Sequence, residues 1–346
     1  MRIVLCFPVA QHHVDTLRAT VPDAEIVNAG QEGVNAALPS ADIFIGHAKV
    51  PVDWQRVVDG GRLRWIQSSA AGLDHCLVPC VIDSDIQVTS ASGLFAPQVA
   101  EQTMALLMGL LRSTRAFEAA REERDFTRLP TDDLRGKTVG IVGFGGNGRQ
   151  IARILSQMDV TILATDYFPD HCPDHVDSLW SPDRLDDLLA TSDIVILTLP
   201  LNAQTRGLFD DERFAKMRPG SYLVNVARGP VVKEAALVRA LDRVPLRGVG
   251  LDVTEVEPLP VTSPLWDDDR LLISPHVGAQ SSRRVDDTIL LACENLRRFR
   301  EGRPLLNLVD KGLGFPRHRA RLVGAQVFSE SELNAGSPSE SQTGDG

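Results

Sequence analysis

The sequence predicts an α/β protein in which two parallel β-sheets are each doubly wound, that is, covered by helices on both faces. Short runs of β-branched residues recur along the chain, and the segments between them are long enough to form helices. These apolar runs alternate with helical patterns, which indicates parallel sheets buried on both faces. With 346 residues, of which 43% are hydrophobic, the chain is long enough for two domains with cores of their own.

The expected strands fall into two groups along the chain. The first group comprises residues 2–6, 41–46, 65–67 and 87–89. The second group comprises residues 137–142, 160–165, 194–198, 222–225, 248–253 and 271–274. Each group is expected to form one sheet, so the chain is interpreted as two units.

Two long helices are expected where the chain passes between these units. The first covers approximately residues 97–121, because Pro97 suits a first turn and apolar residues such as Val99 and Leu107 recur at helical spacing. The second follows Ser281 and ends at Gly302, where the letters GRP stop a helix. The segment 318–346 is rich in Ser, Glu and Gly and is expected to be a disordered tail.

Composition and charge exclude several classes of function. The 36 Lys and Arg against 46 Asp and Glu give a formal net charge of −10, which argues against non-specific nucleic-acid binding. No apolar stretch approaches the ~20 residues that a membrane-spanning helix needs, so no membrane partner is expected. The 5 cysteines are scattered and contain no C-x-x-C, so neither a disulfide framework nor a zinc module is expected. The expected location is a reducing compartment, the cytoplasm.

One segment imitates a metal site. Residues 171–175 read HCPDH and contain two histidines four residues apart. The segment includes a proline, so we do not expect the rigid helix face that would aim both imidazoles at one ion. No bound metal is therefore expected in this chain.

A glycine-rich turn joins the strand expected at 137–142 to a segment with helical periodicity. The letters GFGGNG contain the pattern G-x-G-x-x-G in the context that it requires, with a strand before it and a helix after it. Glycine permits the tight turn and a close approach of ligand to backbone, and the helix N-terminus offers unpaired N–H groups to phosphate. The residues expected to contact a pyrophosphate are Gly143, Gly145, Gly146, Asn147 and Gly148.

An acidic residue at the end of the next strand completes a dinucleotide-binding pattern. Asp166 follows Gly148 by eighteen residues, and its carboxylate can accept hydrogen bonds from the ribose hydroxyls of an adenosine. The same carboxylate repels a 2′-phosphate, and the three residues after it, which read YFP, supply no cation for one. The sequence therefore predicts a Rossmann unit that binds NAD rather than NADP.

Three segments downstream each place one polar residue shortly after an expected strand. Arg228 follows YLVN, Glu257 follows GLDV, and His276 follows LIS. Strands of an open α/β sheet end at the ligand crevice, so these side chains can converge there. The planar fork of an arginine matches a substrate carboxylate, and a histidine beside a carboxylate is a natural proton donor to a carbonyl. Singly, each residue could be a surface ion pair or a solvated group; together, after a dinucleotide motif, they favour a redox site.

The motif set as a whole resembles the D-isomer-specific 2-hydroxyacid dehydrogenase family over approximately residues 1–310. The segments that carry the resemblance are GFGGNG with Asp166, LPLNAQTRGLF, VNVARG, LDVTEVEP and SPHVGA. The resemblance implies an NAD-dependent oxidoreductase that interconverts a small 2-oxo acid and the D-2-hydroxy acid by hydride transfer. It implies that Arg228 binds and polarises the 2-oxo acid, that His276 is the acid/base, and that Glu257 pairs with His276.

The resemblance also implies which residues line the cofactor and the substrate. The aspartate of the family's L-D-V segment holds the nicotinamide carboxamide, and here it is Asp252. The segment SSAAGLD resembles the family's carboxylate loop, in which the backbone amides of Ala71 and Gly72 would face the substrate. A tight turn after a strand has the same pattern, and the sequence does not separate the two interpretations. The remaining expected cofactor contacts are Leu199, Pro200, Val226, Ala227 and Gly278.

A split architecture follows from the resemblance. Residues 1–100 and 282–315 would form a flavodoxin-like substrate domain, and the Rossmann NAD-binding domain, residues 101–281, would be inserted between them. The two long helices would act as the hinge, and closure would exclude water from the hydride path. A homodimer formed through the nucleotide domain is implied by the resemblance alone.

Several substrates and one role of a different class remain open. Glyoxylate or hydroxypyruvate is the leading substrate, because residues 46–49 contain no arginine where phosphoglycerate-specific relatives tend to carry one. D-3-phosphoglycerate dehydrogenase activity is the second alternative. Asn147 also departs from the family pattern, which usually has an apolar residue there. A non-enzymatic NAD(H)-sensing protein, like the corepressors built on this fold, would bind NADH without turnover.

Overall fold

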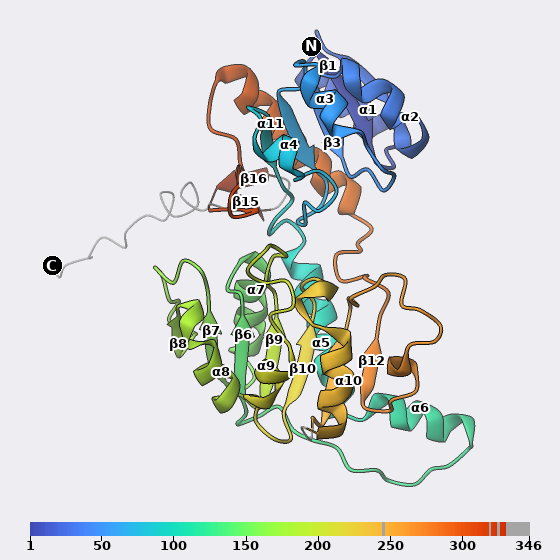
Figure 1. The fold of residues 1–346 in the computed structure, drawn as a ribbon, viewed down its shortest axis with the longest axis vertical. Coiled ribbons are helices and arrows are strands. Elements are labelled where there is room, and N and C mark those ends of the chain that lie inside the picture. The colour runs from blue at the N-terminus through green and yellow to red at the C-terminus, as the bar shows by residue number, and fades with distance from the viewer. Residues whose placement is uncertain (244–245, 318–319, 324–325, 330–346) are drawn as a thin grey trace, which may run out of the picture. The chain divides into compact units, whose positions relative to one another are not determined.

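The computed structural model describes residues 1–243, 246–317, 320–323 and 326–329, and its contacts divide the chain into two units (Figure 1). Unit 1 comprises Met1–Leu94 and the chain from Ser282 onward, and unit 2 comprises Phe95–Ser281. Each unit contains a parallel sheet with helices on both faces, which confirms the predicted fold class. Among the described residues, none of the helices combines the length and the hydropathy needed to cross a bilayer.

The parallel sheet of unit 1 has the strand order β2-β1-β3-β4-β5, which reverses beside β1 as in flavodoxin-like sheets. β2 is an edge strand that the search for apolar runs does not detect, because it reads EIVN and only two of its residues are apolar. The strands are β1 (Arg2–Cys6), β2 (Glu25–Asn28), β3 (Ile43–Gly46), β4 (Trp65–Ser68) and β5 (Gln87–Thr89).

Helices cover both faces of this sheet. Successive residues of a strand point to opposite faces, so in β1 Val4 packs against one helix layer while Ile3 and Leu5 pack against the other. The first layer comprises α2 (Gly30–Ala37), η1 (Leu38–Ser40), α3 (Trp54–Asp59) and α4 (Pro79–Ile82). The second layer comprises α1 (Gln11–Thr20) and α11 (Arg284–Glu301).

The chain after α11 differs in part from the prediction. α11 ends where expected, because Gly302 has a φ of 66° in the left-handed region that glycine adopts easily. The expectation of disorder from residue 318 is wrong for residues 320–323 and 326–329, whose letters ARLV and QVFS form two antiparallel strands that contact α11 through β16. Val327 is buried and contributes apolar surface. The prediction missed it because the composition of the last residues is mostly polar. Residues 330–346 lie outside the described residues. The strands are β13 (Val309–Asp310), β14 (Phe315–Pro316), β15 (Ala320–Val323) and β16 (Gln326–Ser329).

The parallel sheet of unit 2 has the order β12-β11-β10-β9-β6-β7-β8, which reverses beside β6 as in Rossmann sheets. A ligand crevice is expected at this reversal, at the carboxyl ends of β6 and β9. The short edge strand β8 was not expected. The strands are β6 (Thr138–Val142), β7 (Thr161–Thr165), β8 (Ser178–Trp180), β9 (Ile194–Leu197), β10 (Tyr222–Asn225), β11 (Gly248–Leu251) and β12 (Leu271–Ile273).

Two hydrophobic cores lie on the two faces of this sheet. In β9, Val195 and Leu197 pack into the core under α8, α9 and α10, whereas Ile194 and Ile196 pack into the core under α5 and α7 (Figure 1). The helices are α5 (Ala96–Leu111), α7 (Gly146–Leu155), α8 (Leu185–Thr191), α9 (Asp211–Ala215) and α10 (Glu234–Arg243), with short 3-10 turns η2 (Pro182–Arg184), η3 (Gly229–Val231) and η4 (Pro264–Trp266).

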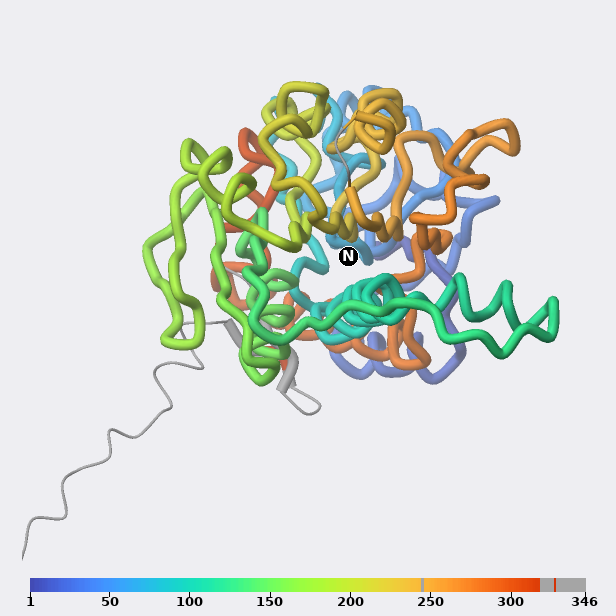
Figure 2. The backbone as a smooth tube through the Cα atoms, turned by 90° about the horizontal axis from the view of Figure 1, so that it is seen from below, coloured from blue at the N-terminus to red at the C-terminus, as the bar shows by residue number. Residues whose placement is uncertain are grey.

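The single helix expected at 97–121 is wrong, because the chain forms two helices there. α5 ends at Leu111, Ser113 adopts a φ of 54°, and α6 begins at Thr114 and ends at Glu122. α5 buries residues against the sheet and α7, whereas α6 buries none. Figure 2 shows α6 extending away from the rest of the unit. Because the residues directly after α5 bury no side chains in a core, the chain changes direction where the apolar residues of α5 end.

Candidate active site

β6 leads directly into the glycine turn of unit 2. Gly143 has a φ of 95°, in the region that glycine adopts without strain. A Cβ on Gly148 would lie 2.4 Å from the carbonyl oxygen of Gly143, so only glycine lets the first turn of α7 pack this closely on the strand end. α7 is held there by its buried face, which consists of Ile151, Ala152 and Leu155 beside Gly148.

The N-terminus of α7 fits the pyrophosphate of a dinucleotide. Its N-cap, Gly145, supplies no side-chain cap, and the first amides of a helix have no acceptor within the helix. Gly145, Gly146 and Asn147 are all partly exposed, so these amides can reach a ligand. The Asn147 side chain makes no hydrogen bond within the described part of the chain, so it does not cap the turn.

Asp166 lies at the end of β7 and faces the glycine turn. Its Oδ2 accepts a hydrogen bond of 2.7 Å from the Phe144 amide, and its Oδ1 accepts one of 2.9 Å from the Phe168 amide. Each oxygen retains a second acceptor position. Two backbone amides, one of them in the glycine turn, therefore fix this carboxylate beside the turn.

The predicted contacts after β9 adjoin the same turn. The Thr198 hydroxyl donates to the Gly143 carbonyl oxygen. A Cβ on Gly143 would lie 3.0 Å from Cδ2 of Leu199. The next residue, Pro200, accepts a hydrogen bond of 2.7 Å from the Thr205 hydroxyl through its carbonyl oxygen. Leu199 thus borders the glycine turn, and Pro200 directly follows Leu199 in the chain.

Arg228 follows β10 in a tightly packed loop. The Asn225 side-chain oxygen accepts from the Ala227 amide at 3.1 Å, which fixes the buried pair Val226 and Ala227 at the strand end. Arg228 is partly exposed, and its guanidinium donates to the Ala227 carbonyl oxygen at 2.7 Å. A Cβ on Gly229 would lie 1.7 Å from the Thr254 carbonyl oxygen, so this glycine brings the Arg228 loop directly against the loop after β11.

His276 and Glu257 form the hydrogen-bonded pair that the sequence predicts. Oε2 of Glu257 lies 2.8 Å from Nδ1 of His276, which leaves Nε2 as the ring nitrogen that a ligand can reach. Burial disfavours a charge on Glu257, but the hydrogen bond and charge of His276 outweigh it and hold the pKa of this carboxyl below its ordinary value. The Thr254 amide, 3.2 Å from Oε1, and the charge of Arg228 act in the same direction.

These contacts bring the three predicted side chains to one edge of the sheet. β10, β11 and β12 are neighbouring parallel strands, and their carboxyl ends carry Arg228, Glu257 and His276 in that order. Carbonyl reduction of a 2-oxo acid needs a cation that binds the substrate carboxylate, an acid/base, and a protein carboxylate that orients the acid/base.

Asp252 is buried and bound mainly to the loop that carries His276. Its Oδ1 accepts from the Ser274 hydroxyl at 2.7 Å and from the Val277 amide at 3.0 Å, and its Oδ2 accepts from the Gly278 amide at 2.8 Å. One acceptor position on Oδ2 remains for a carboxamide. Ser274 is absent from the site residues predicted from the sequence, although it directly precedes the Pro275-His276 pair.

Ala71 and Gly72 lie in unit 1, in the loop after β4. The Ser68 hydroxyl accepts from the Ala70 amide at 3.1 Å, and the Ala70 carbonyl oxygen accepts from the Ala91 amide at 2.9 Å, so the loop is tied at its base. Ala71 is exposed and Gly72 is partly exposed, which leaves their backbone accessible to a small anion.

Among the described residues, one group of side chains has its potential metal ligands within 4.8 Å of one another, namely His12, His13 and Asp286 in unit 1. Nδ1 of His13 accepts from the Ala10 amide at 2.9 Å, so its ring proton is on Nε2, 2.8 Å from Asp286. Because both nitrogens of His13 are thus engaged, the group is a hydrogen-bonded helix cap. The segment 171–175 forms no such group.

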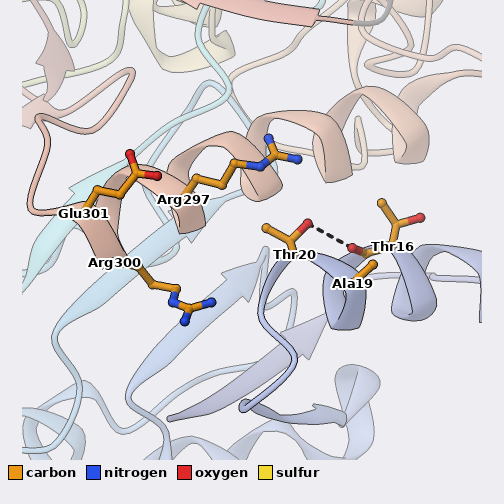
Figure 3. Close-up of a pocket in the computed structure, with 6 residues that line it drawn as sticks. All are labelled: Thr16, Ala19, Thr20, Arg297, Arg300 and Glu301. Carbon is orange, nitrogen blue, oxygen red and sulfur yellow. Dashed lines mark hydrogen bonds between the residues drawn. The ribbon is translucent and has the colours of Figure 1, made fainter.

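A surface pocket of about 640 Å³ lies between α1 and α11 in unit 1 (Figure 3). The Thr20 hydroxyl donates to the Thr16 carbonyl oxygen at 3.0 Å, and the Thr16 hydroxyl donates within α1 as well. Arg297 and Arg300 are paired with Glu294 and Asp23. The pocket contains none of the predicted site residues. Its lining consists of Thr16, Ala19, Thr20, Arg297, Arg300 and Glu301.

Comparison with known proteins assigns this site to a family. Residues 104–278 match the family described as D-isomer specific 2-hydroxyacid dehydrogenase, NAD binding domain. The chain belongs to this family. The prediction of an NAD-dependent dehydrogenase with an NAD-binding domain is thereby confirmed.

Individual relatives agree with the family. The chain is 34% identical over 264 residues to a glyoxylate reductase of Thermofilum pendens, a match that covers 72% of this chain and 75% of that relative. It is 31% identical over 283 residues to a D-3-phosphoglycerate dehydrogenase of Mycobacterium bovis, covering 81% of this chain and 53% of that relative, so it spans about half the latter's length. A solved D-isomer specific 2-hydroxyacid dehydrogenase from Xanthobacter autotrophicus Py2, in complex with NADPH and MES, is 29% identical with a TM-score of 0.78. That match covers 91% of this chain and 99% of the Xanthobacter chain.

Proposed function

We propose that this enzyme reduces a small 2-oxo acid to the D-2-hydroxy acid with NADH, and catalyses the reverse oxidation, with Arg228, Glu257 and His276 as its catalytic residues. The observation that carries the proposal is the 2.8 Å contact between Nδ1 of His276 and Oε2 of Glu257. The charge of Arg228 acts on the same carboxylate. Unit 2 is the nucleotide domain in this proposal, and unit 1, with the Ala71 and Gly72 amides, is the substrate domain.

Each side chain has one task in this reaction. The Arg228 fork binds the substrate carboxylate and polarises the neighbouring carbonyl. NADH, when bound, supplies the hydride that reaches the carbonyl carbon. His276 gives the proton on Nε2 to the carbonyl oxygen as negative charge develops there, and Glu257 stabilises the protonated imidazole and orients it. In the oxidation direction, neutral His276 takes the hydroxyl proton.

The glycine turn and Asp166 favour NADH over NADPH. In this proposal the α7 amides and Asn147 bind the pyrophosphate, the Asp166 carboxylate accepts from the ribose hydroxyls, and Leu199, Pro200, Val226, Ala227, Asp252 and Gly278 line the rest of the cofactor. A 2′-phosphate would lie beside the Asp166 carboxylate and be repelled. The relative from Xanthobacter holds NADPH, so binding of both cofactors to this chain is a direct test.

Glyoxylate or hydroxypyruvate is the proposed substrate. The support is the similarity to a glyoxylate reductase and the absence of an arginine among residues 46–49, where a phosphate would need a strong cation. A panel of 2-oxo acids, with phosphohydroxypyruvate included, tests this choice by the loss of NADH absorbance. NADH binding without turnover of any of them would indicate a non-enzymatic NAD(H) sensor instead.

The decisive experiment removes the imidazole. His276→Ala should lower kcat for the best 2-oxo acid by about 10²–10⁴-fold, because it removes the acid/base, while the Kd for NADH stays nearly unchanged. His175→Ala, at an exposed position of the same unit, serves as the control and should keep the activity. A His276→Ala variant that loses NADH affinity as much as it loses kcat would contradict the assignment.

The proposal extends to assembly and location. α6 and the segment 123–131 form an arm in which nearly all side chains are exposed, and Phe126 is 103% exposed (Figure 2). An apolar side chain in such an arm is best covered by a second copy of the chain, so the enzyme is proposed to be a homodimer that pairs through the arm. All five cysteines are free thiols, three of them buried, which supports the cytoplasm as the location.

A further inference from the structure

We propose that Gln102 and Ser274 are positioning residues that fix the imidazole of His276 through Asp252. The inference rests on the proposed catalytic role of His276. Neither residue belongs to the site predicted from the sequence, and all four lie in unit 2, on α5, after β11 and after β12.

The side chains form a directed chain of hydrogen bonds. Nε2 of Gln102 donates to the Ser274 hydroxyl at 2.9 Å, and that hydroxyl donates its single proton to Oδ1 of Asp252 at 2.7 Å. Because Gln102 can only donate from Nε2, it forces the hydroxyl to act as an acceptor on that side and as a donor toward Asp252. The buried Asp252 carboxylate, 3% exposed, is oriented by this chain.

Asp252 in turn binds the loop of His276 on both sides of the imidazole. Its carboxylate accepts from the amides of Val277 and Gly278, and its backbone carbonyl oxygen accepts from the His276 amide at 2.8 Å. A Cβ on Gly278 would lie 2.7 Å from Oδ2 of Asp252, so the loop and the carboxylate are in close contact.

His276 needs this support because its backbone is strained. Its φ is 54°, in the left-handed region, and a histidine persists there only when the surroundings fix it. The side-chain direction of a residue follows its backbone angles, so relaxation of φ would turn Nδ1 away from Glu257 and Nε2 away from the substrate. Small misplacements of a catalytic group cost large factors in rate.

The test compares three variants that break the chain of hydrogen bonds. Gln102→Leu removes the donor, Gln102→Glu keeps the size but replaces the donor by an acceptor, and Ser274→Ala removes the hydroxyl. Each should lower kcat by about 10- to 100-fold, while the Kd for NADH, measured by fluorescence titration, changes by a smaller factor, because the Asp252 carboxylate keeps its bonds to the Val277 and Gly278 amides. Ser274→Thr, which keeps a hydroxyl, should retain the wild-type kcat.

The control is Gln98→Leu, one helical turn earlier on α5. The side-chain oxygen of Gln98 has no hydrogen-bond partner in the described part of the chain, so this variant should keep the wild-type kcat. Wild-type kcat in Gln102→Glu and Gln102→Leu would overturn the proposal, as would equal losses in the Gln98 variant. If His276→Ala itself keeps its activity, the proposed function fails; if only the Gln102 and Ser274 variants keep theirs, the positioning role alone fails.

Discussion

Single residues at the strand ends set the distances between the catalytic groups. Gly229 is an example, because its missing side chain lets the Arg228 loop touch the Thr254 backbone. His276 is another, because a left-handed backbone angle directs its imidazole toward Glu257. Both positions depend on backbone geometry, and a substitution of Gly229 tests this geometry without touching the ligand.

Gly229→Ala should separate the two loops. The added Cβ would lie 1.7 Å from the Thr254 carbonyl oxygen, and because this atom belongs to the backbone it cannot rotate away. We expect the free energy of unfolding in urea to fall by about 1–3 kcal/mol, with a loss of kcat. Gly33→Ala is the control, since its Cβ would make only an ordinary contact at 3.5 Å with the side chain of Ala29. Equal stability of the two variants would contradict the close packing.

Glu257→Gln should change the pH dependence of 2-oxo acid reduction. The pKa of Glu257 lies below its ordinary value, so the carboxylate remains ionised at neutral and mildly acidic pH and is lost only as pH falls further. Reduction needs protonated His276, and the carboxylate stabilises this form. Without the carboxylate this stabilisation is lost, so the alkaline limb of kcat/KM for reduction should move to lower pH.

The matched control for this profile is Glu255→Gln. Glu255 lies in the same loop and is exposed, and its Oε2 accepts from the Glu234 amide, a contact that a glutamine oxygen can also make. The wild-type profile should persist in this variant. An unchanged profile in Glu257→Gln would argue against the pairing with His276.

At the scale of elements, α11 is joined to the sheet of unit 1 by a buried polar network. Nδ2 of Asn295 donates to Oε1 of Gln67 at 2.8 Å and to the Leu306 carbonyl oxygen at 3.1 Å, and its Oδ1 accepts from the Leu306 amide at 2.7 Å. The Thr89 hydroxyl also donates to Oε1 of Gln67 at 2.8 Å. The network therefore connects β4, β5, α11 and the segment that follows α11.

Asn295→Ala should destabilise this connection strongly. Asn295 is 0% exposed, so its loss leaves the Leu306 backbone groups buried without partners. We expect the free energy of unfolding to fall by about 2–4 kcal/mol in denaturant titrations. The exposed Asn35, which donates to the Pro51 carbonyl oxygen, gives the control variant Asn35→Ala, with an expected change within about 0.5 kcal/mol. A loss as small as in the control would show that the network contributes little.

At the scale of the whole molecule, the exposed arm after α5 predicts the oligomeric state. Phe126→Glu places a charge where the proposal puts an apolar contact between two copies, so it should convert the dimer into a monomer in analytical ultracentrifugation. Met158→Glu changes another exposed apolar residue, outside the arm, and should leave the dimer intact. A monomeric wild type, or a dimer that persists in the Phe126 variant, would refute the proposed interface.

The features that the sequence alone predicted are those that depend on residues close together in the chain. Apolar runs and the residues that end them indicate strands, and the turn GFGGNG with Asp166 depends on residues close together in the chain. The polar residues at three strand ends could be predicted as well, because each comes shortly after a recognisable strand. Parallel strands bring their carboxyl ends to one edge of a sheet, so these residues were expected to lie together. The edge strands β2 and β8 were not predicted from the sequence. Each pairs with only one neighbouring strand and is partly exposed, so neither needs a long run of apolar residues.

Only the tertiary structure decided the contacts between distant residues. The bond from Gln102 to Ser274 joins positions 172 apart, and the one from Asn295 to Gln67 joins positions 228 apart. Such bonds depend on strand register and helix packing, which no local periodicity encodes. The left-handed backbone of His276 has the same origin, because local preference opposes this conformation and surrounding contacts outweigh it.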